Sequence, residues 1–255
     1  IIFGLLYKGI DRKISAHMQG RIGPPIRQPF RDVRKIFTKE NIVPENSIPW
    51  IFNLVPLLGL VATISILIYL PIGGFSPLMS WGGDLILILY LLMFPSLAMV
   101  IGGFSSGSPY AIVGAQREMA TMIAYEFPLA IIIISIAWKL TQMGGQNVFA
   151  LATLPGTRIW NNLSLPLGFI GFAILLLALI IVTPAELSKI PFYAPEGQAE
   201  IAGVLLVEYS GRNLAMFYLT DGVKTVVMAS IIVALFFPYN LSALPLLGLE
   251  GGSYV

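Results

Sequence analysis

The stretch IFNLVPLLGLVATISILIYLP, at residues 51–71, decides the fold class. It contains no charged residue, and about 20 mostly apolar residues are enough for a helix to cross a hydrocarbon layer about 30 Å thick. Within such a layer each backbone polar group must be bonded inside the protein, which an α-helix achieves by itself. The stretch therefore predicts a membrane-spanning helix.

Four further stretches are similarly long and mostly apolar, and they lie at residues 85–104, 119–140, 165–183 and 214–237. Residues 1–7 are also apolar, but they are too few to cross and are expected to be the end of a truncated first helix. The sequence thus predicts an all-α polytopic membrane protein with six visible spanning helices. It is expected to form a single transmembrane domain over residues 1–255.

The composition of the whole chain supports this class. Of its 255 residues 56% are hydrophobic and 11% are charged, whereas a soluble domain has about 25% charged residues. The net charge of +2 does not predict nucleic-acid binding. The chain has no cysteine and one histidine, His17, which we expect at the surface. No catalytic residue, bound metal or bound cofactor is therefore expected in this chain.

Basic residues are concentrated near the beginning of the chain. Nine of the fifteen Lys and Arg residues lie between Lys8 and Lys39, so the positive-inside rule predicts a cytoplasmic loop over residues 8–50 of a cell-membrane protein. Within it, residues 28–40 have the pattern of an amphipathic helix. The apolar side comprises Phe30, Val33, Ile36 and Phe37, and the basic side comprises Arg31, Arg34, Lys35 and Lys39. Two interpretations remain open, a lipid anchor and a docking surface for a protein partner.

Ionisable residues inside the predicted spans are candidates for function, because each costs about 2.5–3.5 kcal/mol on insertion scales. Glu126 lies among apolar residues with no cation within four positions, so its partner is expected on another helix or in water. Asp221 and Lys224 are three residues apart and share a helix face. They form either an internal ion pair or part of a hydrated charge relay.

A third group of candidates lies in the predicted acidic loop at residues 184–212, which contains Glu186, Lys189, Glu196, Glu200 and Glu208. Glu196 and Glu200 are four residues apart, so a helix would place two like charges together. In a low-dielectric cavity one of the two is expected to hold a proton. The loop is either a solvated turn or part of a proton or ion path that includes Glu126, Asp221 and Lys224.

Three segments resemble a known family. They are RKISAHMQGRIGPP at 12–25, followed by Gln28, Asp32, Lys35 and Lys39; GSPYAIVGAQRE at 107–118, leading to Glu126; and ELSKIPF at 186–192, followed by PEGQAE at 195–200 and EYSG at 208–211. In order and spacing they resemble the junction subunit of the complex I and energy-converting [NiFe] hydrogenase superfamily. That resemblance implies eight spanning helices, of which the last two are missing here.

The resemblance also implies a function. The junction subunit anchors a hydrophilic redox arm and couples it to H⁺ or Na⁺ translocation in the membrane arm. The implied partners are a [NiFe]-hydrogenase-like large subunit, a small iron–sulfur subunit, antiporter-like and other small membrane subunits, and lipid. Iron–sulfur clusters and a nickel–iron or related centre are expected in those partners. The residues expected to dock the arm are Gln19, Arg21, Arg31, Asp32, Arg34, Lys35, Lys39 and Arg117.

Several positions distinguish the branches of this superfamily. Tyr193 stands where the respiratory pattern has Asp, Gln198 where it has Glu, and Lys189 where it has Arg. GSPY at 107–110 and EYSG at 208–211 resemble the energy-converting hydrogenase branch, so the chain looks most similar to the membrane-bound hydrogenases and the related sulfane reductases. A quinone-reducing complex I subunit is the first alternative, and a stand-alone ion transporter is the second, although no internal repeat favours a transporter.

Overall fold

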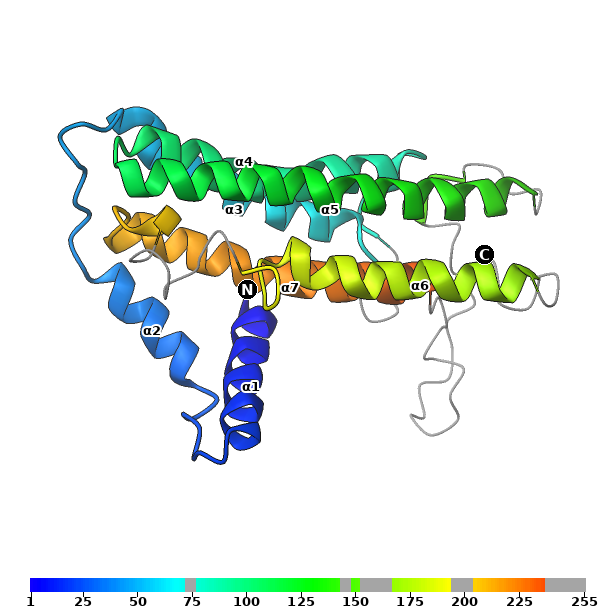
Figure 1. Cartoon of the computed structure of the whole chain (residues 1–255), viewed down its shortest axis with the longest axis horizontal. Helices are drawn as coiled ribbons and strands as arrows, with labels where there is room; N and C mark the ends of the chain where they lie inside the picture. Colours follow the sequence, from blue (N-terminus) through cyan, green and yellow to red (C-terminus); the bar gives the residue numbers. More distant parts are fainter. Residues whose placement is uncertain (72–76, 143–147, 152–166, 194–203, 237–255) are drawn as a thin grey trace.

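The computed structural model describes residues 1–71, 77–142, 148–151, 167–193 and 204–236, and the described residues form helices without any strand. The elements in chain order are α1 (Ile2–Met18), α2 (Gln28–Phe37), α3 (Pro49–Tyr69), α4 (Asp84–Ser105), α5 (Pro109–Gln142), α6 (Leu167–Glu186), the short 3-10 helix η4 (Val204–Leu206) and α7 (Gly211–Phe236). Figure 1 labels the seven α-helices.

Five of the described helices, α3 to α7, are long and apolar enough to cross a membrane. They lie where the sequence predicted them, which confirms the all-α polytopic class. The main difference is α5, which begins at Pro109 and has 34 residues, so it starts ten residues before the predicted span. α1 has 17 residues and is shorter than a full crossing.

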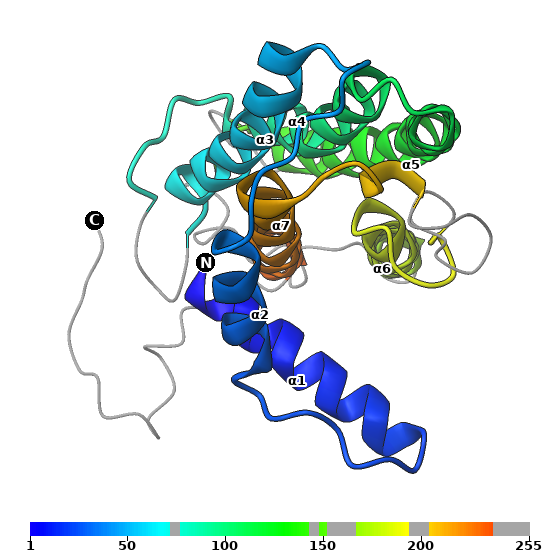
Figure 2. The ribbon, with the colours of Figure 1, turned by 90° about the vertical axis from the view of Figure 1, so that its left-hand side faces the viewer.

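The helices are arranged in two rows with a side projection. In Figure 1 α3, α4 and α5 form the upper row, and α6 and α7 lie below them. Figure 2 shows that α1 and α2 leave this bundle together. α7 has contacts with α1, α2, α3, α4 and α6, and most of its length is buried. It is therefore the central helix of the fold.

α6 ends inside the bundle, beside the middle of α7. Its last residue, Glu186, meets Lys224 of α7. Lys224 is thirteen residues after Gly211, at which α7 begins, which corresponds to about 20 Å along a helix. The chain after Glu186 therefore starts its connection to α7 at the depth of the middle of that helix.

The predicted basic loop requires a correction. α1 continues through Met18, so residues 8–18 are helical. Lys8 and Arg12 attach this part of α1 to α7 and α2. The predicted helix at 28–40 ends at Phe37. Its Val33 is buried against Leu5 of α1 and Leu219 of α7. Protein therefore covers part of the apolar side that a lipid anchor would have used.

α1 and α7 cross where each has a glycine. A Cβ atom added at Gly4 would overlap the carbonyl group of Gly222. By contrast, a Cβ added at Gly222 would lie 3.7 Å from the nearest atom of Gly4, which is an ordinary contact. The close approach of the two backbones therefore depends on Gly4.

A Gly4→Ala change should push α1 away from α7, whereas Gly222→Ala should be tolerated. The expected cost is about 1–3 kcal/mol, as for other overpacked contacts, because backbone rather than a flexible side chain would have to move. The measurement is the thermal stability of the assembled complex in detergent. Gly171→Ala serves as the control, since a Cβ there meets no atom within 4 Å. Equal stability of all three variants would show that the crossing is not tight.

Candidate functional site

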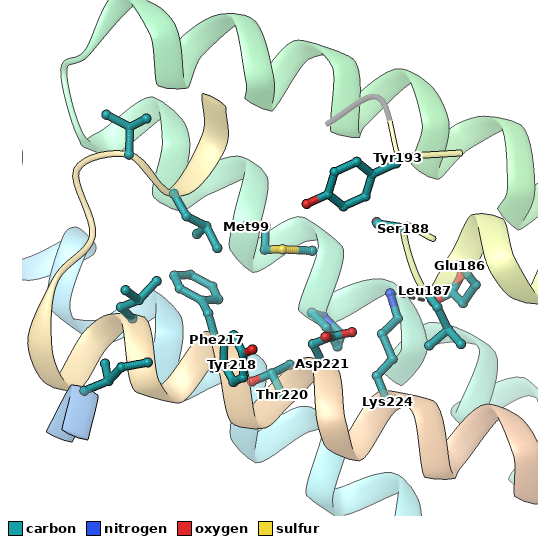
Figure 3. A pocket seen from close by; sticks show the side chains of 15 residues that line it. Met99, Glu186, Leu187, Ser188, Tyr193, Phe217, Tyr218, Thr220, Asp221 and Lys224 are labelled. Atoms are coloured by element: carbon teal, nitrogen blue, oxygen red, sulfur yellow. Dashed lines mark ion pairs between the residues drawn. The ribbon is translucent and has the colours of Figure 1, made fainter. Parts of the chain in front are cut away.

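Two groups of charged side chains meet on the central helix α7. We call Lys224 with Glu186, Ser96, Tyr125 and Glu118 the inner cluster. We call Asp221 with Lys8 and Lys189 the outer cluster. Both lie next to one cavity, which Figure 3 shows from close by.

The inner cluster is organised around a buried lysine. Lys224 Nζ lies 2.9 Å from Glu186 Oε1, and the two residues are 3% and 2% exposed. Lys224 Nζ also donates a hydrogen bond of 3.0 Å to Ser96 Oγ of α4. An unpaired charge in such a place would be costly, so the cation and the carboxylate depend on each other.

The cluster continues from α4 to α5. Ser96 Oγ and Tyr125 Oη are 2.7 Å apart and share a hydrogen bond. Glu118, which is 1% exposed, lies near the hydroxyl groups of Ser96 and Ser188 and near the charge of Lys224. Within the described part of the chain, Glu118 Oε1 has no hydrogen-bond donor. A connected set of polar groups thus crosses the bundle from α7 to α5.

The charge balance of the inner cluster indicates what it can do. It holds one cation, Lys224, and two buried carboxyl groups, those of Glu118 and Glu186. If both carboxyl groups were ionised, the buried cluster would carry a net negative charge, which a low-dielectric interior disfavours. The balanced state therefore has one proton on this pair of carboxyl groups. Hydroxyl groups between charged residues are suitable for passing that proton on.

The outer cluster joins three separate elements. Asp221 Oδ2 lies 2.6 Å from Lys8 Nζ of α1 and 3.3 Å from Lys189 Nζ, in the turn after α6. Lys8 also donates a hydrogen bond of 3.1 Å to the carbonyl oxygen of Tyr218, and its Nζ lies 4.0 Å above the centre of that ring. Asp221 thus connects α1 and the turn after α6 to the central helix.

These contacts disfavour one of the two interpretations of Asp221 and Lys224, the internal ion pair. Asp221 and Lys224 do not neutralise each other, since Asp221 binds Lys8 and Lys189 while Lys224 binds Glu186. The spacing of three residues allowed an ion pair within α7, but charged residues of other elements bind both groups instead. The two charges therefore bind different helices.

The cavity beside these clusters has a volume of about 340 Å³. Its lining includes apolar side chains, among them Met99 and Phe217, and the charged residues Glu186, Asp221 and Lys224. Tyr193 extends into the same space from the turn after α6. The cavity therefore gives both clusters a shared polar surface within an otherwise apolar region.

The other predicted coupling residues are distributed differently. Glu126 is half-buried on α5, directly after Tyr125. It is close enough for its charge to act on Glu186. Glu208 is half-buried in the turn before α7 and is outside the residues that line the cavity. Glu196 and Glu200 lie outside the described residues.

The predicted docking residues do not form one uniform group. Those exposed on or just after α2 are Arg31, Arg34, Lys35 and Lys39. Arg21 donates a hydrogen bond to Gln19 in the exposed turn after α1. Asp32 instead holds α1 and α2 together, since it accepts hydrogen bonds from Arg12 at 2.8 Å and from Gln28 at 2.9 Å. Arg117 is half-buried on α5.

Two important residues were missed by sequence reasoning. Glu118 was overlooked because the predicted span began at Met119, one residue later. Its spacing of seven from Tyr125 places both on one helix face, and this signal could have identified it. Lys8 was counted only as part of the basic loop. Within the described residues, no three His, Asp or Glu side chains lie together as metal ligands would.

Comparison with known proteins gives a consistent result. A family model described as NADH dehydrogenase matches residues 1–249. Hydrogenase-4 component C of Escherichia coli (strain K12) is 34% identical over 235 residues, which cover 92% of this chain and 71% of that protein. A chain in the structure of the membrane-bound sulfane sulfur reductase, an archaeal respiratory membrane complex, is similar with a TM-score of 0.79 and 30% identity. That match covers 91% of this chain and 73% of the other.

Proposed function

Because this chain belongs to the NADH dehydrogenase family, we propose that it is a membrane coupling subunit of an ion-translocating oxidoreductase complex. In this role it anchors a hydrophilic redox arm and links electron transfer in the arm to ion movement through the membrane. The similarity to a hydrogenase-4 component and to a chain of a respiratory membrane complex supports the proposal. The five spanning helices agree with such a position.

The observation that carries the proposal is the buried inner cluster. A lysine and two carboxyl groups at the middle of a membrane bundle are expensive to place there, and charge balance leaves them with one proton. We propose that a proton moves between Glu186 and Glu118 through Lys224 and the Ser96 hydroxyl group. Glu126, half-buried on the outer part of α5, would pass it towards a neighbouring membrane subunit.

The remaining acidic residues complete the proposed path. The path from the redox arm to the cavity would include three acidic residues, Glu196, Glu200 and Glu208. Asp221, which lines the cavity, would lie at the end of that path on α7. A change of one pKa unit corresponds to about 1.4 kcal/mol. A modest change in charge at the arm is therefore enough to shift a proton along closely spaced carboxyl groups.

The proposed partners follow from the same role. The arm would contain a [NiFe]-hydrogenase-like large subunit and a small iron–sulfur subunit, which carry the redox centres. Antiporter-like and other small membrane subunits would receive the coupled charge. The basic end formed by α1 and α2 would face the cytoplasm, in keeping with its excess of cations.

The test is to purify the complex through a tag on this chain from its native membrane. The copurifying protein should contain iron, acid-labile sulfide and nickel, and vesicles should take up ions when an electron donor and acceptor are supplied. Quinone reduction without nickel would instead support the quinone-reducing alternative. Ion transport by the isolated chain, with no copurifying iron, would contradict the proposal and favour a stand-alone transporter.

Docking of the arm gives a separate prediction. Reversing Arg31, Arg34 and Lys35 to Glu should release the hydrophilic subunits while the membrane subunits stay together. The reason is that these side chains are exposed. If they bind an anionic surface of the arm, the acidic side chains of the variant would repel that surface. The measurement is the set of subunits retained on the tagged chain at a fixed ionic strength, because salt screens exposed charges over about 8 Å at physiological strength.

A matched control keeps the charge and changes the side chains, with Lys at positions 31 and 34 and Arg at position 35. This control should retain the arm. If the charge-reversed chain also retains it at the same salt concentration, α2 does not dock the arm.

A further inference from the structure

The side of α1 that faces away from α7 carries a continuous row of large apolar side chains, which we call the apolar stripe. Its members are all exposed, and successive members are three or four residues apart, so they lie along one face of the helix. They are Phe3, Tyr7, Ile10, Ile14 and Met18. The opposite face of α1 holds Lys8 and Arg12, which contact α7. The stripe is therefore open to whatever surrounds the protein.

The apolar stripe extends from the middle of the bundle to the outer end of α1. Near its start, Gly4 lies against Gly222, at the middle of α7. Further along α1, Arg12 meets Tyr218, about one turn nearer to the beginning of α7. α1 then continues away from the bundle, as Figure 2 shows. From Phe3 to Met18 the helix rises about 22 Å, which is enough to cross half of a hydrocarbon layer about 30 Å thick.

The residue types on α1 favour acyl chains over a partner helix as the cover of the stripe. Helices in membranes pack through small residues, which allow two backbones to come close, whereas the stripe consists of large side chains. The small residues of α1, Gly4, Gly9 and Ala16, are buried. They face other parts of this chain, since Gly4 lies against α7 and Gly9 lies against the carbonyl group of Ile26. The positions of α1 that suit helix packing are thus already occupied.

The outer end of the stripe is surrounded by cations without acidic neighbours in the sequence. Residues 12–31 include five Lys and Arg residues and no acidic residue. Lys13 and Arg21 are both exposed. The loop after α1 folds back on the helix, because the backbone N–H of Arg21 donates a hydrogen bond of 2.9 Å to the carbonyl oxygen of Ala16 and Gly23 lies against Lys13. An anionic group at this end of α1 would therefore meet more than one cation.

We propose that an anionic phospholipid binds along α1, with its acyl chains on the apolar stripe and its phosphate group beside Lys13 and Arg21. Such a lipid satisfies both features at once, because apolar chains cover the stripe and the headgroup complements the cations. An acidic protein surface would use the cations and leave the stripe uncovered. The site goes beyond the proposed coupling function and does not depend on it. Because α1 brings Lys8 to Asp221, the lipid supports the outer cluster from outside the bundle.

A photoreactive side chain on the stripe can identify what covers it. Met18 is 84% exposed, so benzoylphenylalanine can replace it without loss of packing. The complex, purified through a tag on this chain, is placed in vesicles of equal parts phosphatidylglycerol and phosphatidylcholine with the same acyl chains, at a fixed ionic strength. After illumination, the masses of the separated chain show which lipid has been attached. Phosphatidylglycerol adducts should exceed phosphatidylcholine adducts about tenfold, because each cation close to the headgroups adds to the attraction.

Matched variants test the role of the two cations. In the Lys13→Gln, Arg21→Gln variant the ratio of the two adducts should fall to about one. The Lys13→Arg, Arg21→Lys variant keeps both charges and should keep the enrichment. Arg212→Gln removes an exposed cation at the beginning of α7 and should not change the ratio. The same photoreactive group in place of Leu58, which is exposed on α3, should show no preference between the two lipids.

Three results would overturn the proposal. Equal attachment of both lipids at position 18 in the chain with Lys13 and Arg21 would show general lipid contact only. Attachment to a partner subunit would show that protein covers the stripe. Enrichment that persists in the double Gln variant would show that Lys13 and Arg21 do not hold the phosphate group. All of these measurements can be made on a complex that moves no ions, so the lipid site and the proposed coupling function can fail separately.

Discussion

A Glu186→Ala variant should not accumulate in an assembled complex, because the change leaves Lys224 charged and buried without its carboxylate. Both residues are almost fully buried, and their charged atoms are 2.9 Å apart. Removal of one partner from a buried ion pair typically destabilises a protein by about 3–5 kcal/mol. That loss is comparable to much of the stability of a typical protein domain. The measurement is the amount of tagged chain recovered with its partner subunits.

The double variant Glu186→Ala, Lys224→Met should recover much of the lost assembly. It removes the stranded charge together with its partner, and well-packed apolar side chains often replace a buried ion pair without loss of stability. Glu45→Ala is the matched control, because Glu45 is exposed and outside the spanning helices. If the Glu186→Ala variant alone assembles normally, the ion pair contributes little to the stability of the assembled complex. If the double variant recovers nothing, the defect has another cause.

Replacement of Glu118 and Glu126 by Gln should abolish most ion movement while electron transfer continues. Gln keeps the size and hydrogen-bonding capacity of Glu but cannot carry an exchangeable proton as a carboxyl group does. We expect the number of ions moved per electron to fall by more than about tenfold, since both groups are costly in the membrane and have no redox role. Vesicle uptake and electron transfer to a soluble acceptor should be measured on one preparation.

Two comparisons sharpen this experiment. Glu45→Gln removes a carboxylate from an exposed position and should leave the ratio unchanged. Glu118→Asp keeps a carboxyl group at the buried position and should preserve part of the ion movement. A normal ratio in the double Gln variant would show that these acids are structural and that the path runs elsewhere in the complex.

Local sequence rules were sufficient for the spanning helices. A segment of about twenty apolar residues has few alternatives to a membrane-spanning helix, because backbone groups without hydrogen bonds are too costly in lipid. The rules were weaker at the ends of the helices. α5 extends back to Pro109, past polar residues such as Arg117 and Glu118 that had marked the edge of the predicted span. Protein contacts allow those polar residues inside the helix.

The partners of the charged residues could not be predicted in the same way. Spacing along α7 placed Asp221 beside Lys224, but spacing says nothing about which other helix approaches. Lys8 is 213 positions away from Asp221 in the sequence and still lies against it. Such a contact depends on how helices pack, and here the close approach of α1 to α7 depends on Gly4. The sequence thus indicated which residues were costly, and the structure shows where their charges are balanced.

The end of α6 inside the bundle has a consequence for the life of the protein in the cell. The turn that begins after Glu186 starts at the middle depth of α7, where non-helical backbone is stable only against protein or a water-filled space. Most amide groups of the described turn are bonded within the chain. Without a neighbour, however, the Lys189 side chain, which is 45% exposed, would meet lipid, where a charge is costly. We therefore expect a short half-life for the orphan subunit, with degradation by membrane proteases. A pulse-chase experiment in cells lacking the partner subunits would measure it, and a stable orphan chain would show that the turn is already shielded.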